Sequence, residues 1–226
     1  MLTAGKSVSA AHVAFMADVT DTDINRLVDT DVLPRALFLR DHGRRFAPLT
    51  AAFASFYFQT QDELTRSARR QVIWDLTARL ERRPDFDAFL ALNTTVLHAD
   101  FDWSIHHDFL TVTLDRCVET ALNRASRVQE AEKSIVEDPE ILSGTPCFAG
   151  TRLPVAHIVA ATEAGATIAE LQEAYPFLNE RLIDDARVYV QAHPRPGRPR
   201  RITDIDTGAA LVSHKVVRRG QNRRDL

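Results

Sequence analysis

The chain has 226 residues with a formal net charge of -3, and 45% of the residues are hydrophobic. This length fits two modest domains, and the apolar share is sufficient for a buried core. The charge is unevenly distributed. Residues 195–226 contain nine Lys/Arg and three Asp/Glu, a balance of +6, so residues 1–194 carry -9. A basic tail on an acidic body indicates a negatively charged partner, either nucleic acid or an acidic protein site.

The two cysteines, Cys117 and Cys147, lie far apart and belong to no CxxC motif. This argues against a disulfide scaffold or a thiolate zinc site and is typical of a reducing cytoplasm. No apolar run approaches the ~18 residues that span a bilayer, and the first ten residues lack the apolar core of a signal peptide. We therefore expect a cytoplasmic protein without a membrane partner.

Capping residues predict two short helices at the start of the chain. Ser9 can cap a helix over 10–18, and Thr20 or Asp21 can cap a second one after a tight turn. Apolar residues then flank Asp41-His42-Gly43, a sequence typical of a hairpin turn. A helix pair followed by a basic hairpin predicts a winged helix-turn-helix.

The middle of the chain is predicted to be helical with one small β-hairpin. We expect a buried helix over 47–58 and an amphipathic helix over 62–83. The stretch FDWSIHHDFLTVTL predicts a hairpin that turns near residues 106–108. Asp115 is then expected to cap a helix over 116–132, whose apolar stripe can pack internally or against a second copy.

Short elements are predicted in the region that follows. They begin with a strand near Ile135 and a small hairpin over residues 146–153. A helix over 155–163 should come next, then one capped by Thr167 and one capped by Asn179. We expect them to form a compact helical module.

The stretch SGTPCFAGTRLPV, residues 143–155, is dense in Gly and Pro. Gly144 and Gly150 have five residues between them and no Lys follows Gly150, so the spacing fails the Walker A pattern. A tight hairpin at Gly150 and a helix that starts at Pro154 explain the pattern better than a phosphate loop. Arg152 could reach a phosphate or bind the Asp138 carboxylate, and we favour the carboxylate.

A signature runs through residues 134–193. It consists of Ile135, Asp138-Pro139, Gly144-x-Pro146, Gly150-Thr151-Arg152-x-Pro154-Val155, Gly165, Tyr175-Pro176 and His193-Pro194. In this pattern the stretch resembles a small-domain family known mainly from bacterial and archaeal antitoxins of type II toxin–antitoxin pairs. Ser143 and Cys147 depart from it, where the family usually has Gly and an aliphatic residue.

The longer layout, with a winged-helix-like start and a basic tail, resembles the long VapB-like antitoxins. Their usual partner is a PIN-like ribonuclease toxin. The resemblance implies that this chain binds and inhibits such a toxin and represses its own promoter by binding operator DNA. A free-standing transcription regulator without a toxin is the alternative.

The N-terminal unit is the better candidate for reading DNA. Residues 134–193 contain three Arg/Lys and nine Asp/Glu. DNA phosphates would repel a surface with this excess of negative charge. We therefore assign the C-terminal module to oligomerisation, as a homodimer. Near the start of the second helix Asn can read adenine and Arg guanine, although several Asp residues surround them and a plain folded helix pair stays possible. The predicted DNA-binding residues are Thr20, Thr22, Asn25, Arg26, Arg40, Arg44 and Arg45.

The tail, expected to be flexible until it meets a partner, has two functional interpretations. RPGRPRR resembles the core of an AT-hook, which lies in the DNA minor groove. Alternatively, its arginines enter the carboxylate cluster with which PIN-like nucleases hold Mg²⁺, and block the metal or RNA. We favour the toxin. The predicted toxin-binding residues are Arg195, Arg198, Arg200, Arg201, Leu211, Val212, Lys215, Val216, Arg218 and Arg219.

We expect no enzyme activity, cofactor or metal. His106 and His107 are adjacent on a predicted strand, so their side chains point to opposite faces and cannot share one metal without distortion. The sequence therefore predicts a mainly α protein. Its predicted parts are a winged helix-turn-helix (1–50), a helical middle with a small β-hairpin (51–133), a compact helical module (134–194) and a basic tail (195–226).

Overall fold

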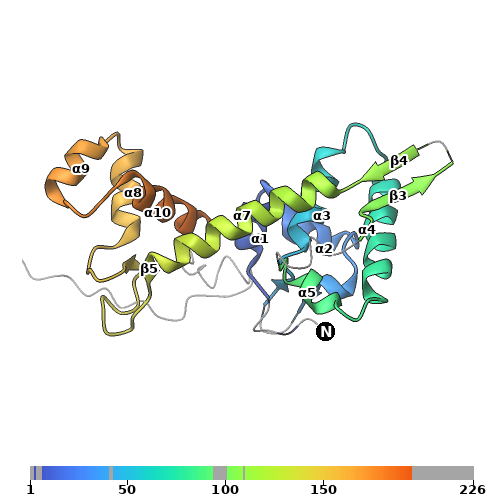
Figure 1. Ribbon diagram of the computed structural model, residues 1–226, viewed down its shortest axis with the longest axis horizontal. Coiled ribbons are helices and arrows are strands. Elements are labelled where there is room, and N and C mark those ends of the chain that lie inside the picture. Colours follow the sequence, from blue (N-terminus) through green and yellow to red (C-terminus); the bar gives the residue numbers. More distant parts are fainter. Residues whose placement is uncertain (1–2, 4–6, 41–42, 94–100, 109, 195–226) are drawn as a thin grey trace, which may run out of the picture. The chain divides into compact units, whose positions relative to one another are not determined.

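The structure, a computed structural model, describes residues 3, 7–40, 43–93, 101–108 and 110–194. These residues are mainly helical, as predicted, and contain three two-stranded antiparallel sheets (Figure 1). Two predicted features, the turn residues Asp41 and His42 and the basic tail, lie outside the described residues.

The chain begins with the predicted helix pair, α1 (Ala10–Ala17) and α2 (Asp21–Asp29). The Ser9 side chain accepts a hydrogen bond from the His12 backbone N–H at 3.1 Å. Thr20 and Asp23 form a reciprocal capping box at the start of α2. Asp18 ends α1 with φ +60°, a left-handed conformation that Asp tolerates better than most residues, and this makes the tight turn possible.

A short hairpin follows the helix pair. After the 3₁₀ turn η2 (Arg35–Leu37), strands β1 (Phe38–Leu39) and β2 (Arg45–Phe46) pair antiparallel, with Phe38 opposite Phe46. Phe46 also bridges to Val8, just before α1. The hairpin is thus joined to the beginning of the helix pair.

The next three helices are α3 (Thr50–Gln59), α4 (Arg66–Glu81) and α5 (Phe86–Leu90). The expected start of the second of these, at residue 62, is wrong. The Thr65 side chain accepts a hydrogen bond from the Ala68 N–H at 3.2 Å, so the helix begins after Thr65.

The middle hairpin consists of β3 (Ser104–His107) and β4 (Leu110–Thr113). The hairpin is present as predicted, but His106 and His107 pair with Thr111 and Leu110, so the turn follows His107 and does not begin at residue 106. It leads into the 19-residue helix α7 (Asp115–Lys133). The prediction that Asp115 caps this helix is wrong, because Asp115 is its first helical residue. Its carboxylate instead accepts a hydrogen bond from the Thr113 hydroxyl.

The last elements are β5 (Ile135–Val136), β6 (Cys147–Phe148), α8 (Val155–Glu163), α9 (Ile168–Ala174) and α10 (Glu180–Ala192). β6 pairs with β5. The predicted small hairpin is also present, because an antiparallel bridge joins Cys147 to Pro154 and the Phe148 N–H donates to the Leu153 carbonyl at 3.1 Å. The caps Thr167 and Asn179 are confirmed.

Gly150 makes the turn that reverses the chain after β6. Its φ is +75°, and no heavy atom lies within 4 Å of the position that a Cβ would take. The backbone conformation, and not crowding, therefore accounts for the glycine. Arg152, two residues later, is exposed and makes no ion pair with another described residue. The preferred contact with Asp138 is wrong, and the Asp138 carboxylate accepts the Glu140 N–H at 2.9 Å instead.

Buried apolar side chains form two clusters. One extends from Val13 to Ala125, and the other from Val128 to Ala192. Helix α7 contributes to both, because Ala125 belongs to the first and Val128 to the second. Residues on both sides of the predicted domain boundary at residue 50 belong to the first cluster. The domain boundaries themselves stay predictions. In the described segments, no helix has the length and apolarity needed to cross a bilayer.

Candidate functional site

The predicted base-reading residues of α2 stabilise the beginning of that helix. Thr20 is the capping residue, and the Thr22 N–H donates to the Asp21 carboxylate at 2.8 Å. The Asn25 side-chain amide donates to the Asp21 carbonyl at 2.9 Å. To contact a base edge, the Asn25 amide would have to exchange this bond for one to DNA.

The predicted phosphate-binding arginines contact the chain itself. Arg44 of the hairpin binds both carboxylate oxygens of Asp29 and donates to the Asn25 carbonyl at 3.1 Å. The hydrogen bond from Arg44 lowers the pKa of Asp29. Arg45 donates to the Ser7 carbonyl at 2.5 Å. These two arginines therefore fasten the hairpin to α2 and to the chain before α1.

Arg26 and Arg40 are less tightly held. Both are exposed. Arg26 pairs with Asp23 at 2.8 Å and lies over the Phe58 ring, 5.5 Å from its centroid. Arg40 stacks on Phe38 at 5.4 Å. Exposed ion pairs of this kind contribute little to stability, so these two guanidinium groups are the most available to a phosphate.

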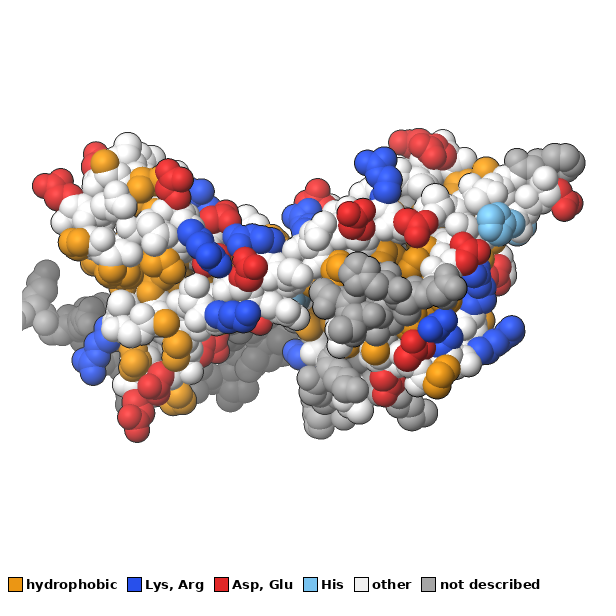
Figure 2. All heavy atoms as spheres, in the orientation of Figure 1, with side chains coloured by type: hydrophobic (Ala, Val, Ile, Leu, Met, Phe, Trp, Pro, Cys, Tyr) orange, Lys and Arg blue, Asp and Glu red, His pale blue; other side chains and the backbone are white. Residues whose placement is uncertain are grey.

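Acidic and basic side chains are interspersed on the face of the molecule shown in Figure 2. Close to the helix pair, Asp23 pairs with Arg26 and Asp29 pairs with Arg44. The sequence-predicted DNA-binding residues thus lie together on α2 and the hairpin, but they do not form an unopposed basic surface.

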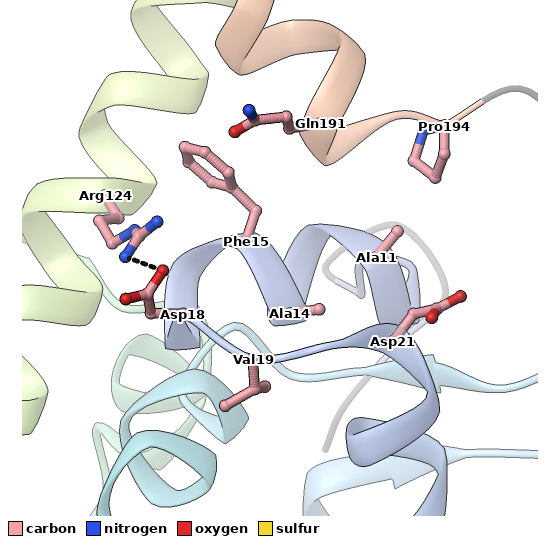
Figure 3. A pocket seen from close by; sticks show the side chains of 9 residues that line it. All are labelled: Ala11, Ala14, Phe15, Asp18, Val19, Asp21, Arg124, Gln191 and Pro194. Atoms are coloured by element: carbon pink, nitrogen blue, oxygen red, sulfur yellow. Dashed lines mark ion pairs between the residues drawn. The ribbon is translucent and has the colours of Figure 1, made fainter. Parts of the chain in front are cut away.

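A second candidate site, which the sequence did not predict, is a cavity of about 390 Å³ lined by α1, α7, α10 and the start of α2. Phe15 extends from α1 toward Gln191 of α10 (Figure 3). Arg124 pairs with Asp18 at 2.9 Å and lies over the Phe15 ring. The cavity combines an apolar wall with one ion pair.

Arg127 joins α7 to α10. It binds Glu130 at 2.9 Å and the carboxylate of Asp184, and it lies 3.4 Å from Asp185. The side chain of Asp185 is only 1% exposed and also accepts the Ser134 hydroxyl at 2.9 Å. A buried carboxylate needs such partners, so this network couples the helical module to the end of α7.

Two histidines and a glutamate meet at the same helix junction. His193, directly after α10, contacts Glu132 of α7, with 3.3 Å between Nε2 and Oε1. The hydrogen bond with Glu132 raises the pKa of His193 and lowers that of the carboxyl. Burial, and then the nearby His193, lower the pKa of His12 to about 4. The sequence did not predict this group, because its members are far apart in the chain.

The predicted toxin-binding residues from Arg195 to Arg219 lie outside the described residues. Of the signature residues, Gly144 adopts φ +78°. The Pro146 carbonyl accepts the Val155 N–H at 3.0 Å, and the Thr151 hydroxyl donates to the Phe148 carbonyl at 2.9 Å. Pro154 directly precedes α8. The signature therefore builds the turn between β6 and α8.

Comparison with known proteins places the C-terminal module in a described family. Residues 135–190 match the family called "Protein of unknown function (DUF433)", within the stretch 134–194 that the sequence marked as a module. Among solved structures, Rv2018 from Mycobacterium tuberculosis is similar over 78% of this chain and 95% of that chain, at 16% identity and a TM-score of 0.30.

A relative matches nearly the whole chain. The protein y4eO of Sinorhizobium fredii, called uncharacterized, is 32% identical over 212 residues, which cover 94% of this chain and 93% of that protein. The match therefore covers much more of the chain than the DUF433 region does. The chain therefore belongs to the family of y4eO and carries a DUF433 region at residues 135–190.

Proposed function

We propose that this protein is a VapB-like antitoxin, which inhibits a PIN-like ribonuclease through residues 195–226 and binds its own operator DNA through a winged helix-turn-helix in residues 1–50. A homodimer, formed through the helical module, presents two N-terminal units to the operator. The proposal starts from the resemblance of residues 134–193 to the antitoxin family and assigns roles to the rest of the chain on that basis.

The distribution of positive charge carries the proposal. In the described part of the chain, Arg44, Arg124 and Arg127 pair with the chain's own aspartates. By contrast, residues 195–226 have nine Lys/Arg and only three Asp/Glu of their own. This local excess of cations suits an external anion, and a cluster of metal-binding carboxylates would supply one.

Inhibition would be electrostatic and steric. An Arg guanidinium forms bidentate hydrogen bonds with a carboxylate. Placed among the carboxylates of the nuclease, it competes with Mg²⁺ and with the RNA phosphate. The apolar residues Leu211, Val212 and Val216 suit a strand or groove contact next to that site.

Operator binding rests on the geometry of the helix pair and hairpin. A three-residue turn, Asp18–Thr20, joins α1 to α2, and the hairpin is tied to α2 through Arg44. This arrangement is compatible with a recognition helix and a wing. Because local aspartates offset the arginines, we expect modest affinity per subunit and a requirement for two copies.

Complex formation tests the toxin half of the proposal. The chain is co-expressed with the protein of the adjacent reading frame, which we expect to be a small PIN-like ribonuclease, and the two are purified through an affinity tag on that protein. We expect a stoichiometric complex. If the adjacent reading frame encodes no such protein, or the chain elutes separately, a free-standing DNA-binding regulator becomes the better interpretation.

Replacing both Arg26 and Arg40 with Gln should weaken binding to promoter DNA and reduce its salt dependence. Each lost phosphate contact lowers the slope of log K against log salt by about 0.9. Exposed Arg82, at the end of α4, provides the matched control as Arg82→Gln. Fluorescence anisotropy at several salt concentrations measures the slopes. Equal slopes for the double variant and the wild type would disprove the assigned phosphate contacts.

Asn25→Ala tests base reading separately from phosphate binding. Loss of a bidentate amide–adenine contact costs about 1–3 kcal/mol and relaxes sequence preference. We therefore expect weaker binding to the operator but unchanged binding to unrelated DNA. An equal loss of affinity for the operator and for unrelated DNA would show that Asn25 does not read a base.

A further inference from the structure

His12, Glu132 and His193 form a cluster with the geometry of a metal site. One ligand atom from each residue lies within 4.8 Å of the other two. The imidazole rings of His12 and His193 are 5.3 Å apart and inclined at 77°. The three residues come from α1, the last turn of α7 and the end of α10, so regular helices hold two of them and the third directly follows a helix.

The orientation of His193 is fixed by a second set of contacts. Its Nδ1 lies 3.2 Å from the Tyr189 carbonyl, which can only accept a hydrogen bond. Nδ1 therefore carries a proton, and Nε2 faces the Glu132 carboxylate. The His193 ring also stacks on Tyr189, with 4.5 Å between centroids. A ring nitrogen that donates to a carbonyl while the other faces a ligand position is the usual arrangement of metal-binding histidines.

His12 supplies the second nitrogen. Its ring makes no hydrogen bond to any described residue, although it lies against a His–Glu pair. In the neutral form of an imidazole one ring nitrogen has a free lone pair. An ion pair between Glu132 and His193 would account for those two residues, but it leaves the placement of a second imidazole beside them unexplained.

We propose that His12, Glu132 and His193 together bind one transition-metal dication, with Zn²⁺ as the best fit. Two imidazole nitrogens and one carboxylate oxygen form a ligand set that Zn²⁺ accepts, with water in the fourth position. Mg²⁺ and Ca²⁺ prefer oxygen ligands, which disfavours them here. Cu²⁺ and Ni²⁺ also bind imidazole and are competitors.

The geometry requires only side-chain adjustments. Tetrahedral Zn²⁺ at about 2.1 Å from each ligand separates the ligand atoms by roughly 3.4 Å. The three atoms are at most 4.8 Å apart. His193 Nε2 and Glu132 Oε1, 3.3 Å apart, already match that separation, so the remaining adjustment involves the His12 ring. The bound metal would connect α1 to α7 and α10 and fix the end of α10, directly before the basic tail. This inference does not depend on the antitoxin proposal.

Metal titration of the full-length, untagged chain tests the proposal. The protein is treated with EDTA, dialysed, and titrated with ZnCl₂ in a calorimeter. We expect one Zn²⁺ per chain and a higher thermal midpoint with Zn²⁺ than with EDTA. With Co²⁺ in place of Zn²⁺, we expect the visible absorption of a tetrahedral site.

Two single variants test whether the bound metal is held by the proposed ligands. His12→Phe retains a buried ring without a lone pair, and Glu132→Gln changes an exposed side chain. Each should weaken Zn²⁺ binding about tenfold or more and abolish the Zn²⁺-dependent rise in thermal midpoint. His157→Ala, at an exposed position on α8, is the control and should bind like the wild type. Circular dichroism in EDTA verifies that each variant is folded.

Absence of saturable Zn²⁺ binding by the wild type would overturn the proposal. So would affinity that is unchanged in both folded variants, because the metal would then be bound by other surface groups. Loss of binding in the His157→Ala control alone would also contradict it and assign the metal to a different site.

Discussion

Removal of residues 195–226 is expected to abolish inhibition of the ribonuclease while leaving the rest of the chain folded. The described helices and both buried clusters lie before residue 195, so circular dichroism and thermal midpoint of the 1–194 chain should stay close to those of the full-length protein. The excess of positive charge is lost with the tail. Ribonuclease assays with equal amounts of each chain provide the comparison.

Substitutions within the tail separate specific contacts from general charge. Replacement of Arg198, Arg200 and Arg201 with Gln should weaken the complex at least about 30-fold, because loss of one desolvated charge pair costs about 2 kcal/mol or more. Arg223 and Arg224, also in the tail but outside the predicted contact set, form the matched control when both become Gln. Equal weakening in the two variants would indicate non-specific attraction. Full inhibition by the 1–194 chain would disprove the role of the tail.

Arg127→Met is expected to destabilise the protein by about 2 kcal/mol. The substitution retains an apolar stem but leaves the buried Asp185 carboxylate with only Ser134 among its described side-chain partners. Breaking a fully buried pair costs about 3–5 kcal/mol, and the partial exposure of Arg127 justifies the smaller value. Urea unfolding measures the difference.

Arg181→Met is the control for this prediction. Arg181 lies in the same cluster, 3.8 Å from Glu130, but its side chain is 73% exposed. We expect a change within about 0.5 kcal/mol. Addition of Asp185→Asn to Arg127→Met should restore part of the stability, because the buried charge is removed. A loss of stability as large in Arg181→Met as in Arg127→Met would contradict the assigned importance of the buried carboxylate.

Helix beginnings were largely predictable from the sequence, because capping is local. Ser9, Thr20, Thr167 and Asn179 each accept a hydrogen bond from a backbone N–H three residues later, as their side chains suggest. The start of α4 was predicted wrongly because Asp62 and Thr65 are both good capping residues. Which of these two residues caps the helix becomes evident only from the hydrogen bonds of the folded chain.

Contacts between distant segments were not predictable. His12 lies 120 residues before Glu132, and Arg127 is 57 residues from Asp184. No periodicity links such positions in one sequence. The same limitation applies to Arg44, whose carboxylate partner on α2 becomes evident only when the hairpin folds against that helix. The sequence identified the residue types for DNA binding, but it did not reveal their internal partners.

Titration of the purified PIN-like protein with the full-length chain, with Mg²⁺ present, shows whether the chain inhibits RNA cleavage. We expect the activity to fall linearly and to reach zero at a fixed stoichiometric ratio, because the chain would bind tightly at the active site. Cleavage that continues at the uninhibited rate with the chain in large excess would contradict the proposed inhibition.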